Sequence, residues 1–287
     1  MKKNFFILAG AIAALTVFSV GCKIYVNAPD SATVSSSSGT TVVGSGKNIV
    51  ASENMISKTL DVKDVKALEV SSISVVYLQD AETHVEFVAP DNVIEYYRYK
   101  ETGGKLKVWN GDNKVSITYQ TNKNLPKLII KAPALTDIDM SGASSFVTKD
   151  LNLGDQKLDL DCSGASVVTI ENIVCRKIEA DFSGASSFRA ASTKTAELDL
   201  NCSGASNVVM DAYAESALVD CSGASKVIIK GKAVSADLRC SGASNIDASG
   251  FEVVSGKVSA SGASSIQSNV GHITKKDCSG ASSIRNK

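Results

Sequence analysis

The sequence has few aromatic residues, few prolines, few histidines and no net charge. Of its 287 residues 6% are aromatic, 4 are proline and 2 are histidine, and 30 acidic side chains balance 30 basic ones. This balance argues against partners that are bound mainly through charge, such as nucleic acid. The histidines, His84 and His272, are far apart and belong to no catalytic motif, so we expect both at the surface. We expect neither a nucleic-acid partner nor a cofactor.

Long apolar runs are missing from the sequence except near its start. Lys2 and Lys3 precede an apolar run over residues 5–20, and Gly21 and Cys22 follow it. The run is too short to span a bilayer comfortably, so an export signal is the better interpretation. A cysteine directly after such a run resembles the bacterial lipoprotein signal, in which that cysteine is lipidated. We predict a signal peptide at residues 1–22 with lipid attachment at Cys22, and an ordinary secretory peptide is the alternative.

The predicted lipid anchor would place the protein at the outer membrane or cell surface, or facing the periplasm. Residues 23–48 include the segments Ser-Ser-Ser-Ser-Gly at 35–39 and Gly-Ser-Gly at 44–46. Such stretches behave as flexible tethers. We predict that this linker holds the following domain away from the membrane.

The strongest pattern in the sequence is the tetrapeptide Ser-Gly-Ala-Ser, which occurs eight times. The copies begin at Ser141, Ser163, Ser183, Ser203, Ser222, Ser241, Ser261 and Ser279. A fixed period near 20 residues is typical of a solenoid, in which each coil buries its apolar face against the next coil.

Apolar residues recur at fixed positions around each copy. Five residues after the leading Ser stand Phe146, Val168, Phe188, Val208, Val227, Ile246, Ile266 and Ile284. One residue before it stand Met140, Cys162, Phe182, Cys202, Cys221, Cys240, Ala260 and Cys278. The positions between these columns are polar, and alternation with period two indicates a strand with one buried face.

We therefore predict an all-β fold, a right-handed parallel β-helix with about 20 residues per coil and a corner at each Ser-Gly-Ala-Ser. Gly permits a backbone conformation that other residues resist, and Ser hydroxyls bond to backbone groups in turns. The right hand follows from the handedness of parallel crossovers. Regular repeats are expected over residues 141–287. Residues 49–140 alternate without repeating, and we interpret them as irregular N-terminal coils and a cap.

Three features together resemble a known family. They are the lipoprotein-like signal, the stretch Lys-Ala-Leu-Glu-Val-Ser-Ser-Ile-Ser-Val-Val-Tyr-Leu at 66–78, and Ala-Pro-Ala-Leu-Thr-Asp-Ile-Asp-Met-Ser-Gly-Ala-Ser at 132–144. They resemble the family described as putative autotransporter adhesin, head GIN domain, found in cell-surface lipoproteins of Bacteroidetes-type bacteria. The resemblance implies a right-handed β-helix and a surface or periplasmic location, and it supplies no catalytic residues. Ser71 and Ser72 stand where this family leads us to expect glycines, so the corner there is expected to be built differently.

Six cysteines remain besides Cys22, an even number that suggests disulfides in an exported protein. Five of them share the position before the leading Ser: Cys162, Cys202, Cys221, Cys240 and Cys278. Parallel side chains in register point the same way, which disfavours the disulfide dihedral near 90°. We predict buried free thiols that pack as small apolar residues. A straight column does not converge four ligands on an ion, so we expect no metal site there.

Acidic residues form two further columns. Two residues before the leading Ser stand Asp139, Asp161, Asp181, Asn201, Asp220, Arg239, Ser259 and Asp277. Four residues before it stand Asp137, Asp159, Glu179, Asp199, Leu218, Asp237, Lys257 and Lys275. We expect outward rows on a solvated face, where stacked carboxylates repel by only about 0.9 kcal/mol. Calcium binding by these rows is an alternative, although the Gly-rich nonapeptide of calcium β-rolls is absent from the sequence.

Two further functional hypotheses rest on residue type. Tyr96, Tyr97, Tyr99 and Trp109 would stack on sugars if exposed, but we favour the interpretation that they form the core of the cap. β-helices also include polysaccharide lyases and hydrolases, which use paired carboxylates. An active site would break the repeating pattern with a local cluster of unlike residues, so we predict no enzyme activity.

The sequence thus predicts a non-enzymatic surface lipoprotein that binds glycans or proteins in adhesion. A polysaccharide-degrading enzyme and a structural or cation-binding surface protein are the alternatives. The sequence assigns no binding residues. We expect a monomer, with end-to-end association through the unpaired edge of the last coil as the alternative.

Overall fold

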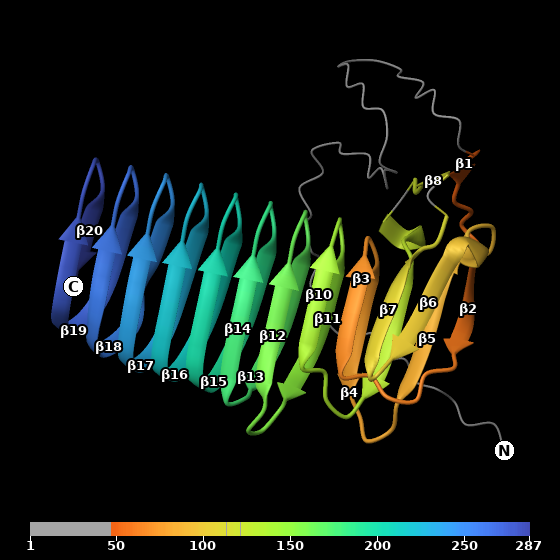
Figure 1. Ribbon diagram of the computed structural model, residues 1–287, viewed down its shortest axis with the longest axis horizontal. Coiled ribbons are helices and arrows are strands. Elements are labelled where there is room, and N and C mark those ends of the chain that lie inside the picture. The colour runs from red at the N-terminus through yellow and green to blue at the C-terminus, as the bar shows by residue number, and fades with distance from the viewer. Residues whose placement is uncertain (1–46, 113, 121) are drawn as a thin grey trace, which may run out of the picture.

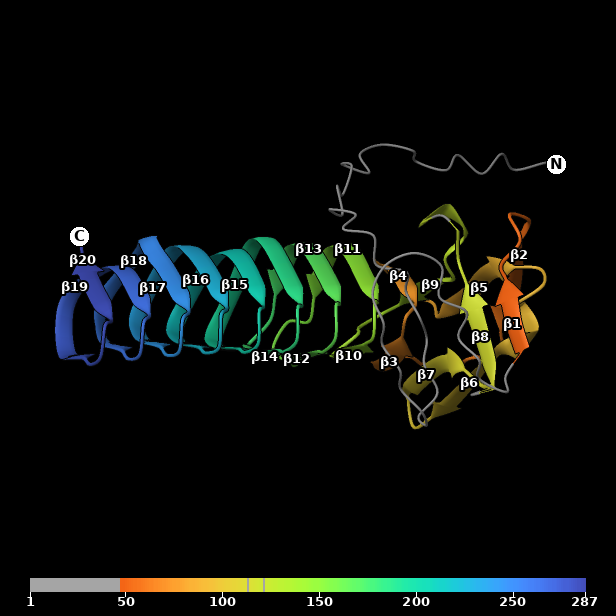
Figure 2. The same ribbon diagram turned by 90° about the horizontal axis from the view of Figure 1, so that it is seen from above.

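The computed structural model describes residues 47–112, 114–120 and 122–287, which form an elongated β structure (Figure 1). Cys22 and nearly all of the predicted linker lie outside these residues. Regular coils stack toward the C-terminal end, and a less regular group of strands forms the other end (Figure 2). The described ranges contain no α-helix, and their two short 3-10 segments are Ile94–Tyr96 and Asn122–Asn124. The predicted all-β solenoid of parallel coils is confirmed.

Two parallel ladders of strands build the coils. The strands before each corner are β7 (Lys105–Asn110), β3 (Ala67–Ser71), β10 (Asp137–Ser141), β12 (Lys157–Cys162) and β14 (Lys177–Phe182). The strands after each corner are β9 (Lys127–Ala132), β4 (Ser74–Gln79), β11 (Ser145–Asn152) and β13 (Val167–Val174). From β15 onward one long strand per coil contributes to both ladders, because pairing continues around the bend between corners. These strands are β15 (Ser187–Cys202), β16 (Asn207–Cys221), β17 (Lys226–Cys240), β18 (Asn245–Ala260) and β19 (Ser265–Cys278), followed by β20 (Ser283–Asn286).

Antiparallel strands cover the first coil. Strand β2 (Met55–Leu60) pairs with β5 (His84–Pro90), β5 pairs with β9, and β6 (Tyr97–Thr102) pairs with β7. Strands β1 (Lys47–Val50) and β8 (Val115–Thr118) form a separate parallel pair over a small second core. Strand β7 pairs with β3 as well as with β6, and β9 pairs with β4 as well as with β5. The first strand of each ladder therefore has a hydrogen-bonded neighbour on both sides.

Side chains at the predicted core positions stack coil upon coil. Val208 lies opposite Val227, Val227 lies opposite Ile246, and all three are 0% exposed. The rings of Phe182 and Phe188 stack with their centroids 5.2 Å apart. Burying one such side chain contributes roughly 1.5–3 kcal/mol, and the gain recurs in every layer of the stack.

The geometry of the corner explains why the same four residues recur. Gly takes a left-handed conformation in every copy, with φ between 65° and 72°. A Cβ on Gly164 would lie 2.6 Å from the carbonyl oxygen of Gly142 in the preceding coil, so a side chain has no room there. The last Ser of the tetrapeptide is buried in the first seven copies. The Ser206 hydroxyl lies 2.6 Å from the carbonyl oxygen of Ser203 and 3.1 Å from that of Phe182 in the preceding coil. The corner thus bonds both within its coil and to its neighbour.

The corner between β3 and β4 is a shorter version of the same turn. Ser71 pairs with Ser141, and Ser74 pairs with Ser145, so this corner has one residue fewer. Ser72 has φ 56° and takes the left-handed place of Gly in the repeats, which L residues rarely occupy. Buried Ile73 donates its backbone N–H to the Ser144 hydroxyl at 3.4 Å. This corner is therefore one residue shorter than those of the repeats, and a serine takes its left-handed position.

Candidate ligand-binding surface

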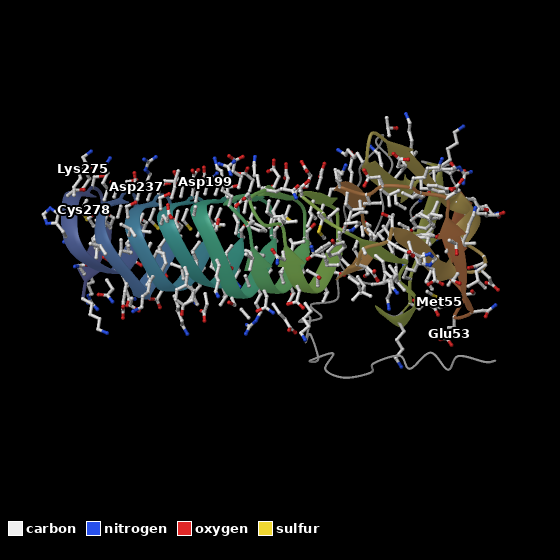
Figure 3. All side chains as sticks on the ribbon, turned by 90° about the horizontal axis from the view of Figure 1, so that it is seen from below. Glu53, Met55, Asp199, Asp237, Lys275 and Cys278 are labelled. Atoms are coloured by element: carbon white, nitrogen blue, oxygen red, sulfur yellow. The ribbon has the colours of Figure 1, made fainter. Side chains whose placement is uncertain are left out.

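The outward side chains of the strands before each corner form one charged face. We define it as the residues two and four positions before each leading Ser, with Glu69 on β3 and Lys105 and Lys107 on β7. Asp137 lies opposite Asp159, which lies opposite Glu179, so the predicted rows of carboxylates are present. Figure 3 shows Asp199, Asp237 and Lys275 projecting outward along one edge of the solenoid.

Charge changes sign along this face. Lysines stand at its N-terminal end, where Lys105 and Lys107 contact Glu69 at 2.8 Å and 2.5 Å. Carboxylates dominate the coils from β10 to β17, and Lys257 and Lys275 follow on the last coils. A partner lying along the face would therefore meet an acidic centre between basic ends.

Ion pairs with two lysines beside the face lower the pKa of one of its carboxyl groups. Glu179 is held by Lys157 and by Lys177, whose Nζ lies 2.6 Å from Glu179 Oε1. Hydrogen bonds from these two ammonium groups lower the pKa of Glu179 to about 2. Glu179 is therefore ionised throughout the physiological range.

Two aspartates on the same face have pKa values shifted the other way. Burial raises the pKa of Asp139, and the neighbouring charges of Glu69 and Asp161 raise it further. Burial also raises the pKa of Asp199, with the charge of Glu179 adding to the effect. Within the described part of the chain, several carboxylates have no ion-pair partner: Asp137, Asp139, Asp161, Asp181, Asp199 and Asp220. These groups are available to a ligand.

An open groove of about 440 Å³ runs beside the charged face in the coils of β15 to β19. Small residues stack along it, with Ser216, Ser235 and Ser255 in one row and Ala217, Ala236 and Gly256 in the next. Asp199, Asp237, Arg239 and Lys257 border it, and the Arg239 guanidinium lies 2.6 Å from Asp237.

The repeat pattern does not predict this groove, although the sequence carries a signal for it. The column five residues before the leading Ser changes from Leu158, Ile178 and Leu198 to Ala217, Ala236 and Gly256. The groove lies where these inward side chains become short, because less volume fills the space beneath the surface.

The predicted column of free thiols is confirmed except at its end. Cys162, Cys202, Cys221 and Cys240 are buried and unpaired, as is Cys175, but Cys278 is exposed. The last described coil has no further coil stacked on it, so its inward position is open to solvent. Burial raises the pKa values of Cys162 and Cys202 to about 12, which keeps both thiols protonated and unreactive at neutral pH.

The four predicted aromatic residues do not form a single cluster. Tyr97 packs against Phe87 with ring centroids 5.0 Å apart and shares a 2.8 Å hydrogen bond with the Tyr119 hydroxyl. Burial raises the pKa of Tyr97 well above its usual value, as expected for a residue of the cap core. Tyr96 packs half-buried against the second core, whereas Tyr99 is 37% exposed.

Trp109 lies apart from the tyrosines of the cap core. Its side chain is half-buried beside the charged face, and its ring centroid is 5.7 Å from the Lys107 ammonium. Trp109 therefore belongs to the surface that carries Glu69 and Lys107.

Within the described ranges, no three His, Cys, Asp or Glu side chains are placed to hold a metal ion. His84 and His272 are both exposed, as predicted. None of the helical segments in the described residues has the length and apolar character needed to cross a membrane.

Comparisons with known proteins agree with the observed fold. The family model described as putative auto-transporter adhesin, head GIN domain, matches residues 64–196 and 190–287. A putative adhesin from Parabacteroides merdae superposes with a TM-score of 0.71 at 16% identity, covering 84% of this chain and 100% of that chain. A putative adhesin from Bacteroides fragilis has a TM-score of 0.59 at 18% identity, with 83% and 100% covered. A putative lipid binding protein from Parabacteroides distasonis has a TM-score of 0.57 at 14% identity, with 84% and 100% covered. No curated protein matches the chain.

Proposed function

We propose that this chain, which belongs to the putative auto-transporter adhesin, head GIN domain family, is a non-enzymatic surface module that binds glycans or proteins. The observation that carries the proposal is the charged face, on which the same outward positions recur coil after coil. Its stacked strands hold these groups at a spacing of about 4.8 Å before any ligand arrives. Such preorganisation reduces the entropy lost on binding.

An extended ligand suits this surface better than a compact one. Successive coils offer similar groups along one line, so a chain lying on the face would make many contacts at once. Contacts that are linked in this way raise the overall affinity even when each is weak. The groove bordered by Asp237 and Arg239 gives such a ligand a channel on the same side of the solenoid.

Two observations support adhesion over polysaccharide degradation. The carboxylates follow the coil period in rows, whereas an acid and a base with separate roles need unlike surroundings. The pKa of Glu179 is lowered, whereas the pKa values of Asp139 and Asp199 are raised, but these carboxylates recur within a lattice. The thiol of Cys162, which follows Asp161, is buried and protonated at neutral pH. The family and the similar structures from Parabacteroides merdae and Bacteroides fragilis are named as putative adhesins, which agrees with a binding role.

The proposal includes attachment to a membrane through lipid on Cys22. Its support is the sequence of residues 1–22, with a basic start, an apolar run and a final Gly-Cys pair. The Ser/Gly-rich residues 23–48 would then separate the solenoid from the outer membrane or cell surface. Labelling of growing cells with a palmitate analogue tests this part, because Cys22→Ser removes the label if Cys22 is the acceptor.

The binding role is tested with the full chain on a glycan array and on a panel of immobilised extracellular proteins. The triple variant Asp159→Asn, Asp161→Asn and Asp181→Asn neutralises the centre of the charged face while keeping side-chain size. We expect saturable binding by the native chain and at least a tenfold loss in this variant. The control is Glu171→Gln with Asp211→Asn, which neutralises exposed residues of other strands. Equal losses in both variants, or release of oligosaccharides from any polysaccharide offered, would contradict the proposal.

A further inference from the structure

Trp109 stands at the head of the row of leading serines. Val108 pairs with Val70, and Val70 pairs with Met140, so the next positions, Trp109, Ser71 and Ser141, lie side by side on the outer surface. The row continues from Ser141 to Ser163 and onward through every corner. One large aromatic side chain therefore adjoins a line of hydroxyl groups.

A pocket of about 470 Å³ opens at this place. Its lining includes Trp109, Ser71, Ser141, Glu69 and Lys107, with the edges of Val70 and Val108. The volume lies within the range of about 300–1,000 Å³ that is usual for small-molecule sites. An aromatic wall with a few converging polar groups is also the usual composition of such sites.

The charged groups of the pocket are linked by ion pairs. The Lys107 ammonium lies 2.5 Å from Glu69 Oε1 and 5.7 Å from the Trp109 ring centroid, and Lys105 lies 2.8 Å from Glu69 Oε2. Hydrogen bonds from both lysines lower the pKa of Glu69, so it stays an ionised acceptor. Glu69 and Lys107 neutralise each other within the pocket, which favours an uncharged ligand over an anion or a cation.

The serine hydroxyls retain capacity for a ligand. The Ser141 hydroxyl donates a long hydrogen bond of 3.4 Å to the carbonyl oxygen of Val70. A hydroxyl group has one donor and two acceptor positions, so Ser141 can accept from a ligand hydroxyl without losing this bond. Ser71 is exposed beside it and offers a second hydroxyl.

A pyranose ring matches these features. Its C–H face is apolar and fits against an aromatic ring, and its equatorial hydroxyls both donate and accept hydrogen bonds. We propose that this pocket binds one pyranose ring of a neutral oligosaccharide, with the ring stacked on Trp109 and its hydroxyls bonded to Ser71, Ser141 and Glu69. This inference rests on the proposed binding function and narrows its ligand to a saccharide at one end of the charged face.

The chain contains one tryptophan, so its fluorescence reports on this pocket directly. The full chain is titrated with soluble hexasaccharides of glucose, mannose, galactose and N-acetylglucosamine, each used separately. We expect at least one of them to shift the Trp109 emission in a saturable way, because stacking removes water from the ring. Binding of the same saccharide is then measured by calorimetry in variants. Trp109→Ala is expected to weaken the affinity for this saccharide at least tenfold. Trp109→Phe is expected to weaken it less, because Phe keeps an aromatic ring.

Matched aromatic controls separate the pocket from the rest of the surface. Tyr99→Ala and Tyr213→Ala remove side chains that are 37% and 50% exposed outside the pocket, and both should bind within twofold of the native chain. Circular dichroism confirms that each variant is folded. If Trp109→Ala leaves saccharide binding unchanged, the proposed role of the pocket is wrong, but the proposed adhesive function is not contradicted. The same conclusion follows if the chain binds proteins but none of the saccharides. Absence of both kinds of ligand would overturn the pocket and the proposed function together.

Discussion

Gly184 lies directly against Gly164 in the preceding coil, and a Cβ on Gly184 would come within 2.5 Å of the Gly164 carbonyl oxygen. The same contact recurs at each later corner, so the row of corner glycines fixes the closest approach of the coils. Two effects therefore confine these positions to Gly, the left-handed φ of 67° at Gly184 and the lack of space for a methyl group.

A pair of glycine variants separates these two effects. Gly154 has a φ of 57°, but a Cβ there would have no atom within 4 Å. Gly154→Ala should therefore lower the free energy of unfolding by roughly 1–2 kcal/mol, because only the left-handed conformation is unfavourable for Ala there. Gly184→Ala should cost roughly 1–3 kcal/mol more, because the methyl group also overlaps the neighbouring backbone. Denaturant unfolding of the full chain measures both, and equal losses would show that the close contact relaxes without cost.

The buried corner serine is expected to stabilise the stack through its hydroxyl. Ser206→Ala removes a hydroxyl proton that is shared between the carbonyl oxygens of Ser203 and Phe182, and it should lower the free energy of unfolding by about 1–2 kcal/mol. Ser203→Ala is the control, because this exposed hydroxyl makes a single long bond of 3.4 Å. Its effect should stay within about 0.5 kcal/mol. A loss in Ser203→Ala as large as in Ser206→Ala would assign the stabilisation to another feature of the corner.

Thiol accessibility should distinguish the end of the cysteine column from its interior. Cys278 is exposed and should react with iodoacetamide in the folded chain. Cys162 and Cys202 should react only after unfolding, because burial raises their pKa values to about 12 and excludes the reagent. Mass spectrometry of labelled peptides identifies each site. Cys278→Ser should remove the labelled peptide from this end, and rapid native labelling of Cys162 would mean that the coils open readily.

Stability at alkaline pH should depend on Tyr77. This residue is 0% exposed, stacks on Phe146, and donates a 2.8 Å hydrogen bond to the carbonyl oxygen of Ala132. Burial raises its pKa to about 12, whereas a tyrosine in the unfolded chain ionises near 10. Below pH 10 both states are neutral; above pH 10 only the unfolded chain ionises. Stability is therefore lost progressively between pH 10 and 12.

The measurement is the free energy of unfolding at pH 9, 10 and 11. Tyr77→Phe should lower stability at pH 9 through the lost hydrogen bond. Its stability should then decline less steeply above pH 10, with a difference from the native chain of about 1 kcal/mol at pH 11. Tyr213→Phe, at a residue that is 50% exposed, should decline in parallel with the native chain. Parallel decline in Tyr77→Phe would assign the alkaline sensitivity to other groups.

Much of the fold was predictable because the repeat places the same side chains in the same environment. Phe188, Val208 and Val227 recur at one position, and a strand that alternates buried and exposed residues can satisfy that pattern only by stacking. The antiparallel cover of β2, β5 and β6 was not predictable in detail. Its strands occur once each, so no repetition reveals which strand pairs with which.

The rows of surface residues were predictable from the sequence, but the pocket was not. The register of Asp137, Asp159 and Glu179 follows from the repeat, because equivalent positions must lie side by side. The pocket at Trp109 depends on the pairing of β7 with β3, two strands separated by a chain reversal whose register the sequence does not encode in any motif. The exposed position of Cys278 was missed because the column pattern alone does not distinguish an inner coil from an outer one.

The recurrence of one corner also makes the number of coils adjustable. Removing residues 203–221 would join Cys202 to Ser222 and restore an intact Cys-Ser-Gly-Ala-Ser junction. The solenoid would lose one layer of about 4.8 Å, while the capped end and its tryptophan would keep their surroundings. Duplication or deletion of the gene segment for one coil can thus change the length of the solenoid by one coil at a time and leave both of its ends unchanged.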